Sequence, residues 1–179
     1  MKIKALAIVV LSALSLSTAV ANAADQGHGK VTFKGSIIDA PCSISPDSID
    51  QTVELGQISN MALADGGKST PRTFDVALEN CDVTALTKGV TLTFTGAAAA
   101  FDASNKTLGI VGTGSGAGVQ ITNGAGSVLT LGTATPFQQI QTGNNTLRFG
   151  AYLMGNGGAV STITVGDFSS VADFTLAYQ

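Results

Sequence analysis

The amino-acid sequence predicts an all-β domain, folded as an antiparallel sandwich or barrel. Short segments in which apolar and polar residues alternate recur along the chain, and Gly, Asn, Asp and Pro separate them. After the first 23 residues, no stretch keeps the 3.6-residue periodicity of a long amphipathic helix. Many short strands joined by turns are typical of sandwiches and barrels.

The start of the chain predicts a secretory signal peptide at residues 1–23. Lys2 and Lys4 give it a positive start, and an apolar run follows at residues 5–16. Ala-Asn-Ala at residues 21–23 fits the small-x-small cleavage pattern. Cleavage there leaves 179 − 23 = 156 residues, which is enough for one domain. No later stretch reaches the roughly 18 apolar residues of a membrane span, so we expect an exported chain without one.

The remaining chain is read as a series of strands, because each segment alternates or is rich in β-forming residues. In order, the expected strands are GKVTFKGSIID at 29–39, TVELGQI at 52–58, RTFDVAL at 72–78, VTLTFTG at 90–96, LGIV at 108–111, GVQIT at 118–122, SVLTL at 127–131, TLRFGAYLM at 146–154, STITVG at 161–166 and VADFTLAYQ at 171–179. Single helical turns are expected at residues 59–67 and 97–104.

The first of these strands has an unusual position, between the cleavage site and the first cysteine. Its apolar register holds Val31, Phe33 and Ile37. Gly35 occupies the same register, and the last strand, at residues 171–179, alternates in the same way. Periodicity alone leaves open whether both strands belong to one closed sandwich or whether the first is buried elsewhere.

Two cysteines, Cys42 and Cys81, are the only ones in the chain. Export places them in an oxidising compartment, where an even pair is typical of a structural disulfide. A redox or metal pair would need CxxC spacing or histidine partners, and the sequence has neither. We therefore expect one disulfide and no metal site.

Composition and motifs disfavour catalysis and nucleic-acid binding. The formal charge of −3 becomes about −5 when the two leader lysines leave, which is unfavourable for a nucleic-acid partner. The only histidine, His28, lies between glycines, and no nucleophile has a recognisable base. Neither glycine-rich stretch, 109–120 or 62–69, matches a phosphate-binding motif. We expect neither an enzyme nor a cofactor.

Five features in order and spacing resemble the chaperone–usher pilin family, above all the rod-forming subunits of P and type 1 pili. They are GKVTFKGSIIDAPCSI at 29–44, DQTVELGQI at 50–58, LENCD at 78–82, Gly166 as the fourteenth residue from the end, and the penultimate Tyr178. The resemblance covers the whole chain after the leader.

This resemblance implies an incomplete immunoglobulin-like antiparallel β-sandwich. The family fold lacks its final strand and is completed in trans by donor-strand complementation. The implied organisation is a donor extension at 24–40 and a pilin domain at 41–179. The implied donor residues are Val31, Phe33, Gly35 and Ile37, and the implied groove-strand residues are Gly166, Phe174, Leu176 and Tyr178.

The resemblance also implies a function and partners. We expect a major pilin that polymerises head-to-tail into a fimbria and supports adhesion indirectly. The expected partners are a periplasmic chaperone, an outer-membrane usher, neighbouring subunits and a tip adhesin, and the expected route runs through the periplasm to the cell surface. A minor adaptor subunit is the alternative. A secreted carbohydrate-binding module is less favoured, because the chain has no Trp to stack on a sugar ring.

Overall fold

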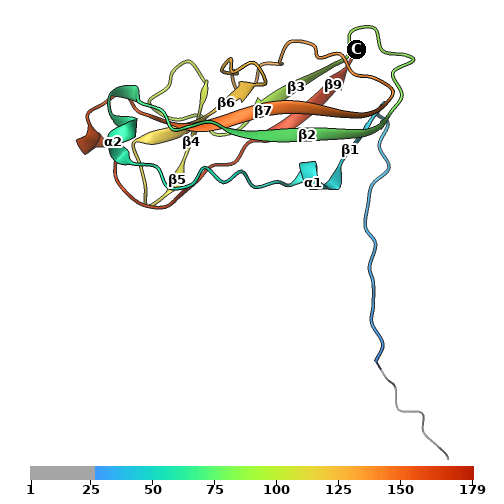
Figure 1. The fold of residues 1–179 in the computed structure, drawn as a ribbon, viewed down its shortest axis with the longest axis horizontal. Coiled ribbons are helices and arrows are strands. Elements are labelled where there is room, and N and C mark those ends of the chain that lie inside the picture. Colours follow the sequence, from blue (N-terminus) through green and yellow to red (C-terminus); the bar gives the residue numbers. More distant parts are fainter. Residues whose placement is uncertain (1–26) are drawn as a thin grey trace, which may run out of the picture. The chain divides into compact units, whose positions relative to one another are not determined.

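The computed structural model describes residues 27–179, so the expected signal peptide at 1–23 lies outside the described residues. The chain divides into two units, Met1–Ile37 and Ile38–Gln179. The described part of the first unit, residues 27–37, is exposed throughout and contains no helix or strand (Figure 1). The strand expected at 29–39 is therefore not formed in this chain. A lone strand leaves its backbone groups without partners, so alternation alone does not produce one.

The second unit is built on a five-stranded antiparallel sheet in the order β1-β2-β7-β6-β4. The long central pair, β2 and β7, aligns Arg72 with Ala151 and Leu78 with Asn145 (Figure 1). The strands of this sheet are β1 (Ser43–Ile44), β2 (Arg72–Cys81), β4 (Thr107–Gly109), β6 (Ala117–Asn123) and β7 (Gly143–Gly155).

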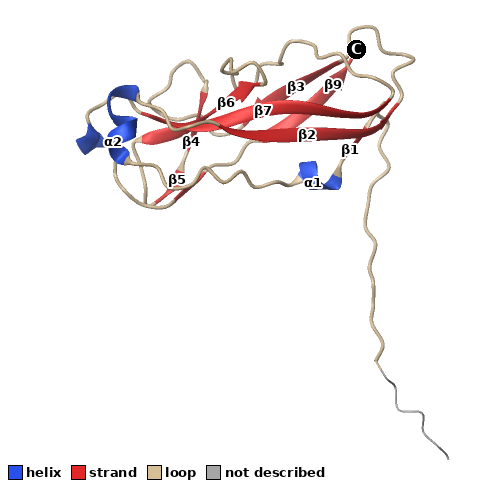
Figure 2. Cartoon of the chain, viewed as in Figure 1, coloured by secondary structure: helices blue, strands red, loops and turns tan. Residues whose placement is uncertain are grey.

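Within residues 27–179, two short sheets make up the rest of the strand structure. β3 (Val90–Thr95) pairs with β9 (Asp173–Tyr178), and β5 (Val111–Gly112) pairs with β8 (Phe168–Ser169). On its other side β3 contacts a loop near Gln138 through backbone hydrogen bonds of 2.8 and 2.9 Å. The expectation of an all-β fold is confirmed (Figure 2).

An apolar core joins β2 and β7 to β3. The rings of Phe94 and Phe149 pack edge to face with their centroids 5.1 Å apart. The ring of Phe74 stacks on that of Phe149 with a centroid distance of 5.7 Å. Val76 on β2 and Leu92 on β3 are fully buried. These contacts follow from the two-residue period, which sends every second side chain of each strand to the same face.

In the part of the chain that the structure describes, four short helical elements interrupt the strands. The turn expected at 59–67 is confirmed, with the hydroxyl of Ser59 accepting a hydrogen bond from the Met61 N–H. The helical turn expected at 97–104 is wrong, because that segment forms non-helical turns, with the Asp102 N–H donating to the Ala99 carbonyl, and one bridge, between Ala98 and Leu108. The elements are α1 (Pro46–Ile49), α2 (Asn60–Leu63), the 3-10 helix η1 (Ala64–Gly66) and the 3-10 helix η2 (Val160–Thr162).

Three expected strands are absent from the second unit. Residues 52–58 alternate but have no ladder partner, and residues 127–131 make only one bridge, between Val128 and Thr122. Residues 161–166 begin in the 3-10 turn η2 and make a single bridge through Thr164. A strand needs a neighbour that offers a continuous row of free backbone groups, and none of these segments makes more than a single bridge.

Cys42 and Cys81 form a disulfide, as expected. The bond joins the residue before β1 to the last residue of β2 and closes a loop with a sequence separation of 39. It ties the short edge strand β1 to the central part of the sheet.

We expect the double substitution Cys42→Ser and Cys81→Ser to lower the free energy of unfolding by about 4 kcal/mol, the chain-entropy value for such a loop. Guanidinium unfolding of this variant and of the oxidised wild type measures the difference. Reduced wild type serves as the control for the loss of the bond alone. Equal midpoints for the variant and the oxidised protein would contradict a stabilising role.

Candidate functional site: an open apolar groove

A groove of about 1400 Å³ opens in the second unit, Ile38–Gln179. Its floor comes from several strands of the sandwich, and its sides come from residues 48–58 and 163–174. The large buried apolar side chains on its floor are Leu63, Phe94, Leu108, Val119, Ile121, Leu153 and Ile163. A large groove with an apolar floor is typical of a binding site, so we take it as the candidate site.

One side of the groove is continuous with the last strand, β9, which has a hydrogen-bonded neighbour on only one side. Within the described residues, β3 is its sole strand partner. Gln179 exchanges backbone hydrogen bonds with Gly89 at 2.9 and 3.0 Å, which fixes the alternation of the ladder. The backbone N–H and C=O groups of the odd-numbered residues of β9 therefore point toward β3. The backbone N–H and C=O groups of Phe174, Leu176 and Tyr178 point toward the free edge.

The apolar face of β9 is only half covered. Phe174, Leu176 and Tyr178 are half-buried, whereas their register partners on β3 are buried, with Phe94 only 4% exposed. The uncovered backbone edge and the uncovered side chains belong to the same three residues. An unpaired edge beside an apolar floor is a site where another strand can add.

Residues 52–58 line the opposite side of the groove, which we call the wall. Val53, Leu55 and Ile58 are half-buried, and the residues between them are exposed. Val53 and Leu55 thus alternate with exposed residues as in a strand, although the wall has no ladder partner.

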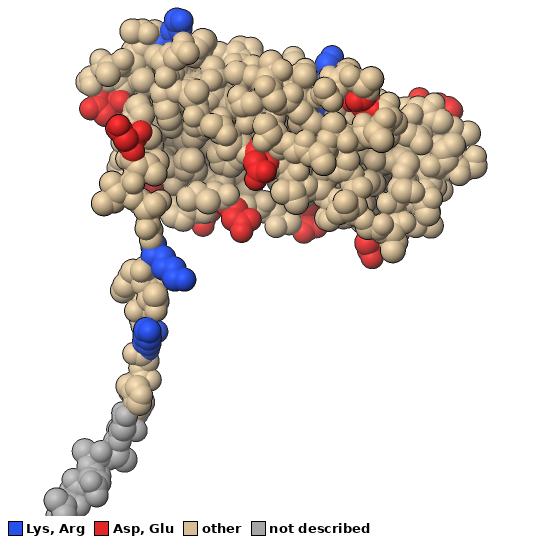
Figure 3. Space-filling model, turned by 180° about the vertical axis from the view of Figure 1, so that it is seen from behind, with Lys and Arg blue, Asp and Glu red and all other residues tan. Residues whose placement is uncertain are grey.

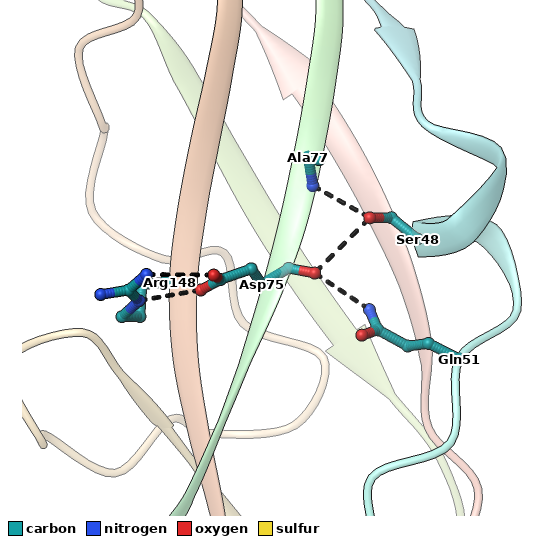
Figure 4. A network of polar contacts seen from close by, with 5 residues as sticks. All are labelled: Ser48, Gln51, Asp75, Ala77 and Arg148. Carbon is teal, nitrogen blue, oxygen red and sulfur yellow. Dashed lines mark hydrogen bonds and ion pairs between the residues drawn. The ribbon is translucent and has the colours of Figure 1, made fainter.

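A small polar network holds the start of the wall on β2 (Figure 4). The Ala77 N–H donates to the Ser48 Oγ at 3.0 Å, and that hydroxyl makes a longer contact of 3.5 Å to the Asp75 carbonyl. The Gln51 side chain donates to the same carbonyl at 3.2 Å. These side chains take the place of a neighbouring strand, so the chain can leave the sheet here without orphaning its backbone groups.

The carboxylate of Asp75 faces Arg148 on β7. Arg148 donates from Nε at 2.9 Å and from its terminal nitrogen at 3.1 Å (Figure 4). The hydrogen bond from Arg148 holds the pKa of Asp75 below its ordinary value. Because the pair is largely exposed, we expect it to add little to stability.

We expect Ser48→Ala to lower the free energy of unfolding by about 1–2 kcal/mol, because it leaves the Ala77 N–H without its partner. Urea unfolding measures the difference. Ser48→Thr keeps the hydroxyl and is the matched control, with a smaller expected loss. A midpoint for Ser48→Ala equal to that of wild type would contradict the anchoring role.

The four residues expected on the groove strand do not all line the groove. Gly166 and Phe174 do, whereas Leu176 and Tyr178 lie farther along β9, outside the cavity itself. A side chain at Gly166 would collide with Thr113 and with the backbone nitrogen of Gly114 at 2.6 Å, so this position requires glycine.

Tyr178 has an unusual environment. Its hydroxyl oxygen is buried and, within the part of the chain that the structure describes, has no hydrogen-bond partner. Burial raises the pKa of this hydroxyl above its ordinary value.

The large apolar residues expected on the donor segment are exposed to solvent. Val31, Phe33 and Ile37 are 75%, 90% and 103% exposed, and apart from Gly35 itself and its two chain neighbours no atom lies within 4 Å of the position that a Cβ on Gly35 would take. Large apolar side chains at such exposure are unfavourable in water. Ser48 and Gln51 were not expected at the site, because their role depends on which strand they meet.

Among residues 27–179, no group of three His, Cys, Asp or Glu side chains is placed to hold a metal ion. In the same range, no helix has the length and apolar character to cross a membrane.

The fold and the groove define an incomplete immunoglobulin-like sandwich with a strand site left open. Residues 31–179 match the model of the family described as "Fimbrial protein". The chain belongs to this family, which confirms the resemblance seen in the sequence.

Similar proteins are fimbrial subunits. The chain is 59% identical to Fimbria A protein of Serratia marcescens and 49% identical to the Major MR/P fimbria protein of Proteus mirabilis, in each case over 179 residues and all of both chains. Among solved structures, the chain resembles a subunit of a chaperone–usher pilus whose structure explains how the rod uncoils. The TM-score is 0.74, and the sequences are 36% identical over 86% of this chain and 97% of that one. The chain also resembles the P pilus rod subunit PapA, with a TM-score of 0.68 and 34% identity over 78% of this chain and all of PapA.

Proposed function

We propose that this chain is the major pilin of a chaperone–usher fimbria. Each copy inserts its N-terminal segment into the groove of a neighbouring copy, and the repeated head-to-tail contact builds the fibre. The observation that carries the proposal is the free edge of β9 above an apolar groove, in a chain that also has an exposed alternating segment. Named relatives that are major fimbrial proteins favour the abundant subunit over a minor adaptor.

The donor residues are Val31, Phe33, Gly35 and Ile37. Burying the three large side chains contributes roughly 5–9 kcal/mol by transfer arithmetic. Each backbone hydrogen bond to the edge of β9 adds about 1 kcal/mol at most. Ordering the segment opposes this gain, but the balance still favours a joint that dissociates slowly.

The open groove also explains why such a chain needs protection before assembly. An uncovered sheet edge with an apolar floor promotes aggregation. In this proposal a periplasmic chaperone covers the edge formed by β9, and an outer-membrane usher is the place where the next subunit replaces it. The signal peptide at 1–23 starts this route, and the fimbria on the cell surface, with a tip adhesin, ends it.

Heating surface fibres in detergent without boiling tests the proposal. Donor-strand joints should survive and give a ladder of multimers, whereas boiling should give monomers only. A single monomer band before boiling would overturn the proposal, because it would mean that no long-lived joint connects the subunits.

A further inference from the structure

The groove is bordered by acidic side chains and by no basic ones. Four exposed carboxylates line it: Asp50, Glu54, Asp167 and Asp173. No Lys or Arg is among its lining residues, and in the part of the chain that the structure describes these four acids have no ion-pair partner. The groove therefore presents an uncompensated negative rim around an apolar floor.

The charge of the two units differs in sign. Residues 38–179 contain five Lys and Arg and eleven Asp and Glu, a formal charge of 5 − 11 = −6. Residues 27–37 contain Lys30 and Lys34 and no acid. Figure 3 shows acidic side chains over the face of the second unit that it draws and basic ones on the extended segment.

The charged positions on the segment at residues 27–37 also match those on the two sides of the groove. Lys30 and Lys34 alternate with Val31 and Phe33, so they lie on the opposite face of an extended segment. On the acceptor, Asp173 alternates with Phe174 in the same way.

Glu54 follows the same rule on the wall, where it alternates with Val53 and Leu55. A segment that places its apolar face in the groove therefore turns its lysines to the side on which Glu54 and Asp173 lie. Opposite charges on neighbouring strands attract across such a face.

We propose that the acidic rim selects and steers a basic incoming strand, the segment at residues 27–37 of a second copy of this chain. This inference rests on the proposed function, since it concerns the same groove. The apolar side chains hold the inserted strand, while the charges raise the rate at which it arrives. Long-range attraction of this kind is screened by salt, with a Debye length of about 10 Å at 0.1 M.

The test uses the full chain, refolded with a labelled peptide of residues 29–38 capped at both ends, which we call the donor peptide. Three versions are compared: wild type, neutral (Lys30→Gln, Lys34→Gln) and reversed (Lys30→Glu, Lys34→Glu). The measurement is the initial rate of incorporation into a complex that survives detergent without boiling, at 20 and 500 mM NaCl.

At low salt we expect the wild-type peptide to enter about tenfold faster than the reversed one, with the neutral peptide between them. At high salt the three rates should converge. Equal rates at low salt would overturn the steering proposal while leaving the proposed function intact. If no peptide is incorporated at either salt concentration, the proposed function fails, and the inference fails with it.

A charge swap on the acceptor sharpens the result. In the variant Glu54→Lys with Asp173→Lys, the reversed peptide should enter faster than the wild-type peptide. An unchanged preference would contradict the role of these two rim positions. Both positions are exposed, and if the variant does not refold, the three peptides on the wild-type chain still decide the proposal.

Discussion

Deleting residues 24–37 is expected to stop fibre growth while leaving a groove that can still receive a strand. The deletion removes the apolar donor register but none of the residues that line the groove. Fibres should therefore be absent from cells that produce only the truncated chain, and the donor peptide should still bind it. Electron microscopy and the detergent ladder measure the first effect, and peptide incorporation measures the second.

Single substitutions in the full chain give the matched control for this deletion. Phe33→Asp places a charge in the donor register and should reduce multimers at least tenfold, since a carboxylate is costly in an apolar groove. Thr32→Asp adds the same charge on the opposite face and should reduce them much less. Fibres of normal length from the truncated chain, or equal effects of the two substitutions, would contradict the donor role.

Phe174→Asp is expected to abolish strand capture by the groove. Phe174 lines the groove on β9 and is half-buried, and the centroid of its ring lies 6.3 Å from that of Phe94. A carboxylate there loses hydration when a strand covers it and has no basic side chain in the groove lining to compensate. We expect donor-peptide incorporation and the periplasmic level of the chain each to fall at least tenfold.

Thr175→Asp provides the comparison on the same strand. Thr175 is exposed on the opposite face of β9, so the same charge remains in water. Peptide incorporation by this variant should stay within about twofold of wild type. Wild-type incorporation by Phe174→Asp, or an equal loss in both variants, would rule out the apolar face of β9 as the capture surface.

The sequence predicts the paired strands well and the unpaired ones poorly. β2, β3, β7 and β9 each appear where an alternating segment was expected, because each has a neighbour that its backbone can bond. The wall at 52–58 has the same alternation but no ladder partner, and it remains without regular structure. Periodicity indicates which face of a segment is apolar, but it does not indicate whether a neighbouring strand exists.

The groove was predictable only in part, for a related reason. Phe174 and Gly166 could be placed at the site because the family resemblance names them as groove-strand residues, although only Phe174 lies on β9. Leu108, Val119 and Leu153 form part of the floor, but they are far apart in the sequence and meet only through the strand order. The anchoring role of Ser48 depends on a contact with Ala77 on β2, which no local pattern reveals.

Backbone hydrogen exchange along β9 tests the central claim most directly. The full chain, refolded at a concentration too low for assembly, is compared before and after addition of the donor peptide. The amides of Phe174, Leu176 and Tyr178, which face the free edge, should become protected, while those of the odd-numbered residues facing β3 should change little. Protection of the even-numbered amides already present without peptide, or unchanged by it, would contradict a vacant strand position in the single chain.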